Sequence, residues 1–209
     1  MKSSSRSTLI LVRHAHTEMA GKFCGQIDPP LSAEGLAQLA ELNEKLGGHS
    51  CTHIFSSDLE RARQTAEAIA NRHNLPVHLL RSLREVAFGS WEGLDWDQVV
   101  AQDPAWAQRW LDQYPSISAP EGEGLEHFRK RIRDAMDSIA DQVQGACAVV
   151  VTHAGVIRTF SGNLARHGNP TEFKCDYVGC WKISREDQQW STLQEVISSE
   201  AYEVTGLRQ

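Results

Sequence analysis

Basic and imidazole side chains follow two short apolar runs of the sequence. Arg13 and His14 come directly after residues 9–12, and His153 lies just beyond residues 146–151. Apolar runs of this length are typical of strands that are buried on both faces of a parallel sheet. Because α/β proteins bind ligands at the carboxyl ends of such strands, we expect these side chains to lie close together.

An arginine and a carboxylate follow two further candidate strands. Arg61 comes shortly after residues 53–55, and we expect it in the first turn of a helix whose N-cap is Asp58. Glu85 lies in the loop that follows residues 77–80. A guanidinium fork matches the oxygens of a phosphate group, and the positive end of a helix dipole also favours an anion. These residue types therefore predict a site for a small tetrahedral anion.

The same side chains could carry out phosphoryl transfer. That reaction needs an in-line nucleophile, positive charge around the phosphoryl oxygens and a proton for the leaving alcohol. A neutral imidazole can be the nucleophile, and a carboxylic acid with a raised pKa can donate the proton. Two arginines can neutralise the phosphoryl charge, and we see no dedicated cluster of acidic ligands for Mg²⁺. We therefore expect neither a metal ion nor a cofactor.

Four ordered motifs make the chain resemble the histidine phosphatase superfamily, also called the phosphoglycerate mutase-like family. Residues 11–17, LVRHAHT, are similar to its RHGxT signature. The resemblance continues in residues 57–66, 83–93 and 151–155, and residues 24–35 also fit the family pattern. Because the motifs are spread over most of the chain, they form a specific signal together.

The resemblance implies a role for each of these side chains. It makes His14 the nucleophile that becomes phosphorylated, and Glu85 the general acid and then the general base for the attacking water. Arg13, Arg61 and His153 would bind the phosphoryl group and stabilise its transition state. The substrate pocket would also contain His16, Thr17, Cys24, Gly25 and Ala154.

Three positions depart from the family pattern. Ala15 stands where the family usually has a glycine, and His16 replaces the common Glu or Gln. Ala20 stands where many members have an asparagine that lines the phosphate pocket. That contact with the phosphate is then either lost or supplied by another residue.

One branch of the family, the α-ribazole phosphatases of cobalamin biosynthesis, looks closest to this chain. The similarity rests on residues 88–93, 122–128 and 179–181. It implies α-ribazole 5′-phosphate as the substrate. A broad phosphomonoesterase and a phosphoglycerate mutase are the enzymatic alternatives. A module that binds a phosphorylated ligand without turning it over is an alternative from another class of protein.

Structural roles compete with the chemical ones at several positions. Rival carboxylates for the acid role of Glu85 are Glu92, Glu121 and Glu123. We expect Arg63 and Arg84 to be solvated surface charges, and the five cysteines to be inert packing residues. Four tryptophans could form a platform for a benzimidazole, but core packing is the commoner use at such spacing: Trp91, Trp96, Trp106 and Trp110.

Alternation of strands and helices predicts an α/β fold, a three-layer α/β/α sandwich with a mostly parallel sheet. The expected domain is the whole chain, residues 1–209, with a helical and loop cap inserted at about residues 90–124. Expected helices cover residues 32–46, 58–73, 96–110 with a break at Pro104, 124–144 and 155–166, and late strands cover residues 179–184 and 190–196.

Composition narrows the setting of the protein. A net charge of −6 argues against general nucleic-acid binding, and no apolar run approaches the length of a membrane helix. Five scattered cysteines, an odd number without a CxxC pair, indicate a reducing compartment, so we expect a cytoplasmic protein. The expected partner is a small phosphomonoester, and the sequence is compatible with a homodimer.

Overall fold

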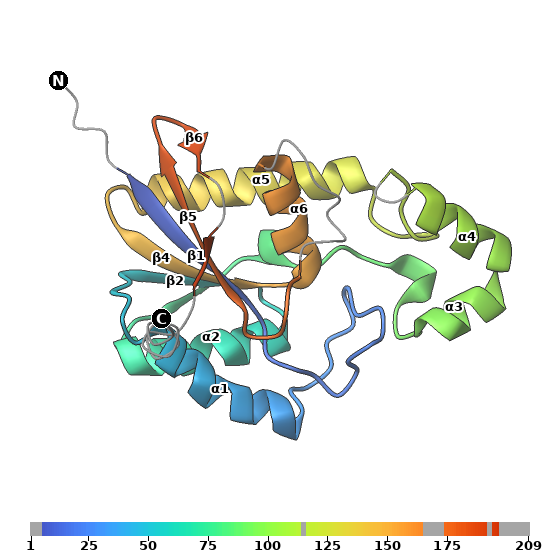
Figure 1. The fold of residues 1–209 in the computed structure, drawn as a ribbon, viewed down its shortest axis with the longest axis horizontal. Coiled ribbons are helices and arrows are strands. Elements are labelled where there is room, and N and C mark those ends of the chain that lie inside the picture. Colours follow the sequence, from blue (N-terminus) through green and yellow to red (C-terminus); the bar gives the residue numbers. More distant parts are fainter. Residues whose placement is uncertain (1–5, 114–115, 165–173, 192–193, 197–209) are drawn as a thin grey trace, which may run out of the picture.

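The computed structural model describes residues 6–113, 116–164, 174–191 and 194–196, and it places one mixed sheet between helices (Figure 1). Four strands run parallel in the order β3-β2-β4-β1: β1 (Ser7–Arg13), β2 (His53–Ser56), β3 (Val77–Leu79) and β4 (Cys147–Thr152). β5 (Cys180–Glu186) extends the sheet antiparallel to β1 and pairs with β6 (Gln189–Trp190) and β7 (Gln194–Glu195). The predicted α/β fold with a mostly parallel sheet is confirmed.

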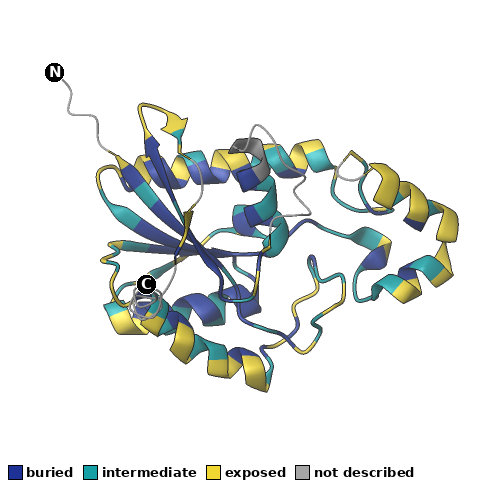
Figure 2. Ribbon diagram, in the orientation of Figure 1, coloured by how far each residue is buried: buried dark blue, intermediate teal, exposed yellow. Residues whose placement is uncertain are grey.

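Helices cover both faces of the sheet. On one side lie α1 (Ala33–Leu46) and α2 (Glu60–His73), and on the other lie α5 (Leu125–Gln142) and α6 (Ala154–Leu164) (Figure 1). Side chains of β1 alternate between the two cores, because Leu9 and Leu11 pack with α5 and α6 while Ile10 and Val12 pack with α1 and α2. Figure 2 shows the strands buried between these helical layers, so the three-layer prediction is also confirmed.

The start of α2 differs from the prediction that Asp58 is its N-cap. Leu59 occupies the cap position without a side-chain hydrogen bond. Asp58 instead forms an ion pair with Arg84, at 2.6 and 2.8 Å. The carboxylate of Asp28, from a distant loop, accepts the backbone N–H of Glu60 at 2.5 Å. A cap supplied through space thus replaces the one expected from local sequence, and Arg84 is a partly buried ion-pair partner rather than a solvated charge.

Two short helices lie beside the sheet, beyond the 3₁₀ turns η1 (Arg81–Leu83) and η2 (Gly89–Trp91). α3 (Trp96–Gln102) and α4 (Pro104–Gln113) confirm the expected break at Pro104. Their core contains Trp91, Val99, Ala107 and Ala119, with Trp96, Trp106 and Trp110 packed against it. These tryptophans pack in one cluster, as expected, but Trp110 also lines the cavity described below.

The remaining expected elements agree with the structure except at their ends. The helix expected from residue 155 begins at Ala154, and residues 165–166 lie outside the described part of the chain. The strand expected at 190–196 is divided into β6 and β7, with residues 192–193 outside the described ranges. Each described helix is too short or too polar to form a membrane span.

Candidate active site

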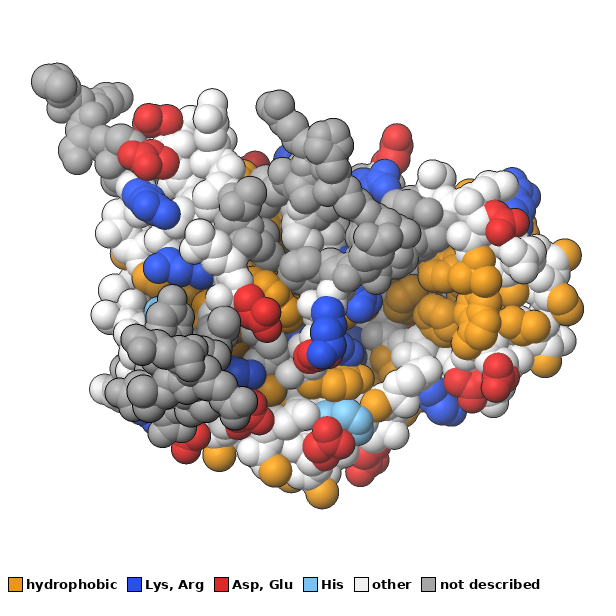
Figure 3. Space-filling model, in the orientation of Figure 1, with side chains coloured by type: hydrophobic (Ala, Val, Ile, Leu, Met, Phe, Trp, Pro, Cys, Tyr) orange, Lys and Arg blue, Asp and Glu red, His pale blue; other side chains and the backbone are white. Residues whose placement is uncertain are grey.

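A cavity of about 510 Å³ opens where the carboxyl ends of β1 and β4 meet the loop after β3. Of the five residues predicted to carry out the chemistry, Arg13, His14, Arg61 and Glu85 line it, whereas His153 does not. They come from three segments that are far apart in sequence, and the parallel strand order brings these segments together. In the space-filling view, basic side chains near the centre adjoin an apolar surface over α3 and α4 (Figure 3).

His14 is buried at the end of β1 with its two ring nitrogens in different environments. Its Nδ1 lies 2.8 Å from the carbonyl oxygen of Ala15. A carbonyl can only accept, so Nδ1 carries the hydrogen and Nε2 keeps its lone pair. Burial, reinforced by the charges of Arg61 and Arg13, holds the pKa of His14 well below its ordinary value. His14 is therefore a neutral imidazole at neutral pH.

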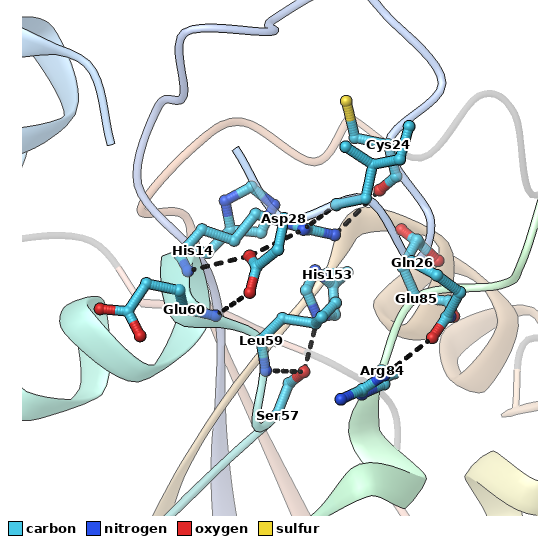
Figure 4. Close-up of polar contacts among 12 residues, drawn as sticks. His14, Cys24, Gln26, Asp28, Ser57, Leu59, Glu60, Arg84, Glu85 and His153 are labelled. Atoms are coloured by element: carbon cyan, nitrogen blue, oxygen red, sulfur yellow. Dashed lines mark hydrogen bonds and ion pairs between the residues drawn. The ribbon is translucent and has the colours of Figure 1, made fainter. Parts of the chain in front are cut away.

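His153 lies behind His14, with the two ring centroids 5.1 Å apart. It is fully buried, and burial holds its pKa well below the ordinary value. Its Nε2 is 2.9 Å from the Ser57 hydroxyl, which also accepts the backbone N–H of Leu59 at 3.3 Å (Figure 4). Ser57 can therefore donate its proton to Nε2, which leaves Nδ1 of His153 as a donor.

Arg61, in the first turn of α2, is only 1 % exposed. Its guanidinium nitrogens donate to four acceptors of the loop before α1, which are the carbonyls of Cys24, Gly25 and Ile27 and the carboxylate of Asp28. Burial lowers the pKa of Arg61, although a guanidinium stays charged at any physiological pH. The loop is thus folded around a fixed positive charge, and Figure 4 shows Asp28 bound to the start of α2.

Arg13 is held by the segment that precedes β5. It donates to the carbonyl of Cys175 at 2.5 Å, and its guanidinium stacks 3.6 Å above the ring of Tyr177. Tyr177 lines the cavity and also lies edge-on to His14, with centroids 5.7 Å apart. Sequence reasoning missed Tyr177, because its segment shares no motif with the other site residues. The lone aromatic before Gly179 carries no local signal of this contact.

Among the described residues that line the cavity, Glu85 is the only one with a carboxyl group. Its oxygens accept the backbone N–H groups of Val86 at 2.9 Å and of Gly155 at 2.8 Å. Burial nevertheless raises the pKa of Glu85 above its ordinary value. The rival carboxylates do not line the cavity: Glu92 accepts the backbone N–H groups of residues 25–27, Glu123 pairs with Arg131, and Glu121 lies elsewhere.

The rest of the cavity wall is mainly apolar and aromatic. It includes Phe23, Phe88, Trp110, Leu125 and Phe128. Lys22, Arg129 and Arg158 add positive charge to the same wall. A ligand held at the arginines would therefore place its remaining atoms against aromatic rings.

In the described part of the chain, no group of three or more His, Cys, Asp or Glu side chains is arranged to hold a metal ion. All five cysteines are free, and burial raises the pKa of each. Cys175 and Cys180, at about 12, are far from forming a thiolate at neutral pH.

Comparison with known proteins shows the family to which the chain belongs. The model of the histidine phosphatase superfamily (branch 1) matches residues 9–197. The chain belongs to the histidine phosphatase superfamily. This finding confirms the resemblance that the motifs indicated. It also favours an enzymatic role for the site, since the named relatives of the chain are phosphatases and mutases.

Relatives within the superfamily carry more than one activity in their names. The chain is 30% identical over 199 residues to an "Adenosylcobalamin/alpha-ribazole phosphatase" of Escherichia coli, covering 92% of this chain and 96% of the relative. It is 30% identical over 183 residues to a "Probable phosphoglycerate mutase GpmB" of Photorhabdus laumondii, with 87% and 85% covered. The crystal structure of the α-ribazole phosphatase from Shigella flexneri superposes with a TM-score of 0.80 at 26% identity, with 92% and 96% covered.

The superfamily pattern predicted five further pocket residues, and the structure divides them. Thr17, Cys24 and Ala154 line the cavity, but His16 and Gly25 do not. His16 instead bonds through Nδ1 to the Ser32 hydroxyl at 2.8 Å, at the cap of α1, and Gly25 points its carbonyl at Arg61. His16 and Gly25 thus lie outside the lining of this cavity, and their place in a substrate pocket stays a prediction.

Two departures from the superfamily pattern also have a structural outcome. Ala15 is fully buried, and its N–H donates to the hydroxyl of Thr65 at 3.1 Å. Ala20 does not line the cavity, whereas the hydroxyl-bearing residues Thr17, Ser118 and Thr159 do. Together with the phenol of Tyr177, these side chains give the cavity wall uncharged polar groups that could contact a ligand.

Proposed function

We propose that the protein is a phosphomonoesterase that works through a phosphohistidine on His14. One observation carries the proposal. A neutral imidazole with a free Nε2, two arginines and a carboxyl group of raised pKa line a single cavity. These groups are the nucleophile, the charge stabilisers and the acid that phosphoryl transfer needs.

In the first step, Nε2 of His14 attacks phosphorus and the ester P–O bond breaks. Arg13 and Arg61 stabilise charge on the phosphoryl oxygens, and His153 donates from the side opposite Ser57. Glu85 gives its proton to the departing alcohol oxygen, so that no alkoxide is released. The products of this step are the free alcohol, the phosphohistidine and the Glu85 carboxylate.

In the second step, the Glu85 carboxylate takes a proton from water as the water oxygen attacks phosphorus. The P–N bond breaks, inorganic phosphate leaves, and His14 and Glu85 return to their starting protonation states. Each group thus serves both halves of the cycle, and no further reactant is needed.

For the substrate we propose α-ribazole 5′-phosphate, whose aromatic base suits the apolar wall beyond the arginines. Phe23, Phe88 and Trp110 contribute aromatic side chains to that wall. Burying roughly 100 Å² of an aromatic base at about 25 cal/mol/Å² contributes about 2.5 kcal/mol, or about 70-fold in kcat/KM. The names of the Escherichia coli and Shigella flexneri relatives support the same choice.

The test is phosphate release in EDTA from α-ribazole 5′-phosphate, ribose 5-phosphate, 4-nitrophenyl phosphate and 3-phosphoglycerate. Ribose 5-phosphate is the matched control, because it has the same primary ester without the base. A preference for the ribazole ester of about tenfold or more over ribose 5-phosphate supports both proposals. Equal rates on these two esters would refute the substrate while keeping the phosphatase.

Two other outcomes point to the alternatives. Conversion of 3-phosphoglycerate to 2-phosphoglycerate in the presence of a bisphosphate primer, without phosphate release, identifies a mutase. Binding of phosphate without turnover of any ester identifies the silent binding module. His14→Ala is the background control in every assay, since it lacks the proposed nucleophile.

A further inference from the structure

Arg131 contacts the loop that carries Glu85, although it does not line the cavity. It lies on α5, and its Nη1 donates to the carbonyls of Ser82 at 2.8 Å and Arg84 at 2.9 Å. Its Nη2 lies 3.4 Å from the carbonyl of Glu85 itself. One guanidinium therefore contacts three backbone carbonyls of residues 82–85, the segment that ends in the proposed acid.

Glu123 holds the same guanidinium from the other side. Its carboxylate accepts both Nε of Arg131, at 3.0 Å, and Nη2, at 2.6 Å. Burial alone would raise the pKa of Glu123, but hydrogen bonds from Arg131 and His127 hold it below its ordinary value, so it stays charged. The backbone N–H of Glu123 also donates to the carbonyl of Ala87 at 2.9 Å.

Both side chains of this clamp are sheltered, with 17 % of Arg131 and 13 % of Glu123 exposed. A forked ion pair of low exposure keeps its geometry better than a solvated one, because water competes less for each donor. The contacts reach the loop at both ends, residues 82–85 from Arg131 and Ala87 from Glu123. The orientation of Glu85 toward Gly155 follows from where this backbone is held.

We propose that Arg131 is a positioning residue for Glu85, which with Glu123 fixes the backbone of residues 82–87 so that the carboxyl group stays at the cavity. The proposal rests on the function proposed above for Glu85. It also gives a purpose to the sequence motif at residues 122–128, whose Glu123 is otherwise remote from the chemistry. Arg131 acts through Glu85 and touches no reacting atom.

Leaving-group dependence separates positioning from a merely structural role. 4-Nitrophenolate is a good leaving group and needs little protonation, whereas the alcohol of a primary alkyl phosphate needs a full proton. A misplaced acid therefore slows the alkyl ester selectively. Arg131→Met should lower kcat on the alkyl ester about 10- to 100-fold, and on 4-nitrophenyl phosphate less than about threefold.

A double-mutant cycle tests whether Arg131 works through Glu85. Glu85→Gln alone should show the same selective loss on the alkyl ester, and adding Arg131→Met to it should change little further, because the acid is already absent. Arg131→Lys keeps the positive charge but lacks the fork, so it should behave like Arg131→Met. Glu123→Gln removes the partner and should give a weaker loss of the same kind.

Arg185→Met is the matched control for loss of a buried arginine at the same helix. Arg185 is 6 % exposed and donates to Asp137 and Asp141 of α5, away from the cavity. It should lower the melting temperature without changing the ratio of rates on the two esters. If Arg131→Met fails to fold, Arg131→Lys and Glu123→Gln carry the same test.

Three results would overturn the positioning role. They are equal slowing of both esters by Arg131→Met, full rescue by Arg131→Lys, and multiplicative effects in the double mutant. Failure of the proposed function would look different, because Glu85→Gln itself would then show no dependence on the leaving group.

Discussion

Replacement of Gly155 by alanine tests the acid role of Glu85 without substituting Glu85 itself. Gly155 is the second residue of α6, and its N–H donates to Oε2 of Glu85. A Cβ at this position would overlap Oε1 of Glu85, its nearest neighbour, and would lie 2.9 Å from Cδ and 3.0 Å from Oε2. Non-bonded carbon atoms prefer about 3.5–4.0 Å, so the carboxyl group must retreat by roughly 0.6 Å or more.

The expected loss follows from what a general acid contributes. Such a group supplies about 10²- to 10⁴-fold, and a displacement near 1 Å can cost about 10²-fold. Gly155→Ala should therefore slow an alkyl phosphate about 100-fold, while 4-nitrophenyl phosphate loses much less. The fold should survive, because alanine is favoured over glycine in a helix by about 1 kcal/mol, which offsets part of the strain.

Steady-state kinetics on both esters, with thermal melting in parallel, are the measurement. Gly48→Ala is the matched control, since a Cβ there meets nothing within 4 Å. Its rates on both esters should equal those of the wild type. Full activity of a folded Gly155→Ala on the alkyl ester would refute the reasoning, because the carboxyl group would then not need its present place.

Three further predictions concern the groups around the phosphate end of the cavity. With an alkyl ester, kcat/KM should fall on the acid side only well below pH 6.5, because the lowered pKa of His14 keeps its imidazole neutral above that point. On the alkaline side, kcat/KM should fall above the raised pKa of Glu85, where the acid has lost its proton. Glu85→Gln should lose this alkaline limb in a pH profile. His14→Ala should abolish turnover while melting like the wild type, and retained turnover would exclude His14 as the nucleophile. Tyr177→Leu should weaken inhibition by inorganic phosphate about tenfold, because the ring that stacks on Arg13 is lost. Tyr177→Phe keeps the ring, so inorganic phosphate should inhibit this variant as it inhibits the wild type. Equal inhibition of the wild type and both variants would contradict the role of the stack.

The fold was predictable because its signals are local and repeated. Apolar runs at β1 and β4 fixed the centre of the sheet, and the cap at Ser32 marked the start of α1. The convergence of His14, Arg61 and Glu85 followed from one rule, that parallel strands end at the same edge. Chain order and residue type were sufficient for these inferences.

Contacts between distant loops carried no such signal. Asp28 caps α2 across more than thirty residues of sequence, where the neighbouring Asp58 looked like the better choice. The ring of Tyr177 reaches Arg13 from the opposite end of the chain. Pairings of this kind depend on side-chain direction in the folded state, which the pattern of residue types in a single sequence does not contain.

For the same reason, the sequence indicated that the arginines bind phosphate but not that they also hold backbone carbonyls. Arg61 was predicted as a phosphate ligand, but most of its donors hold the carbonyls of residues 24–27. Arg13 is tied in the same way to Cys175, and Arg131 to the loop of Glu85. A guanidinium can satisfy several backbone carbonyls at once in a fixed plane, which the single ammonium of lysine cannot do. Loops that lack ladder hydrogen bonds of their own thereby gain partners for their carbonyls, and these contacts place the groups that the loops carry around the cavity.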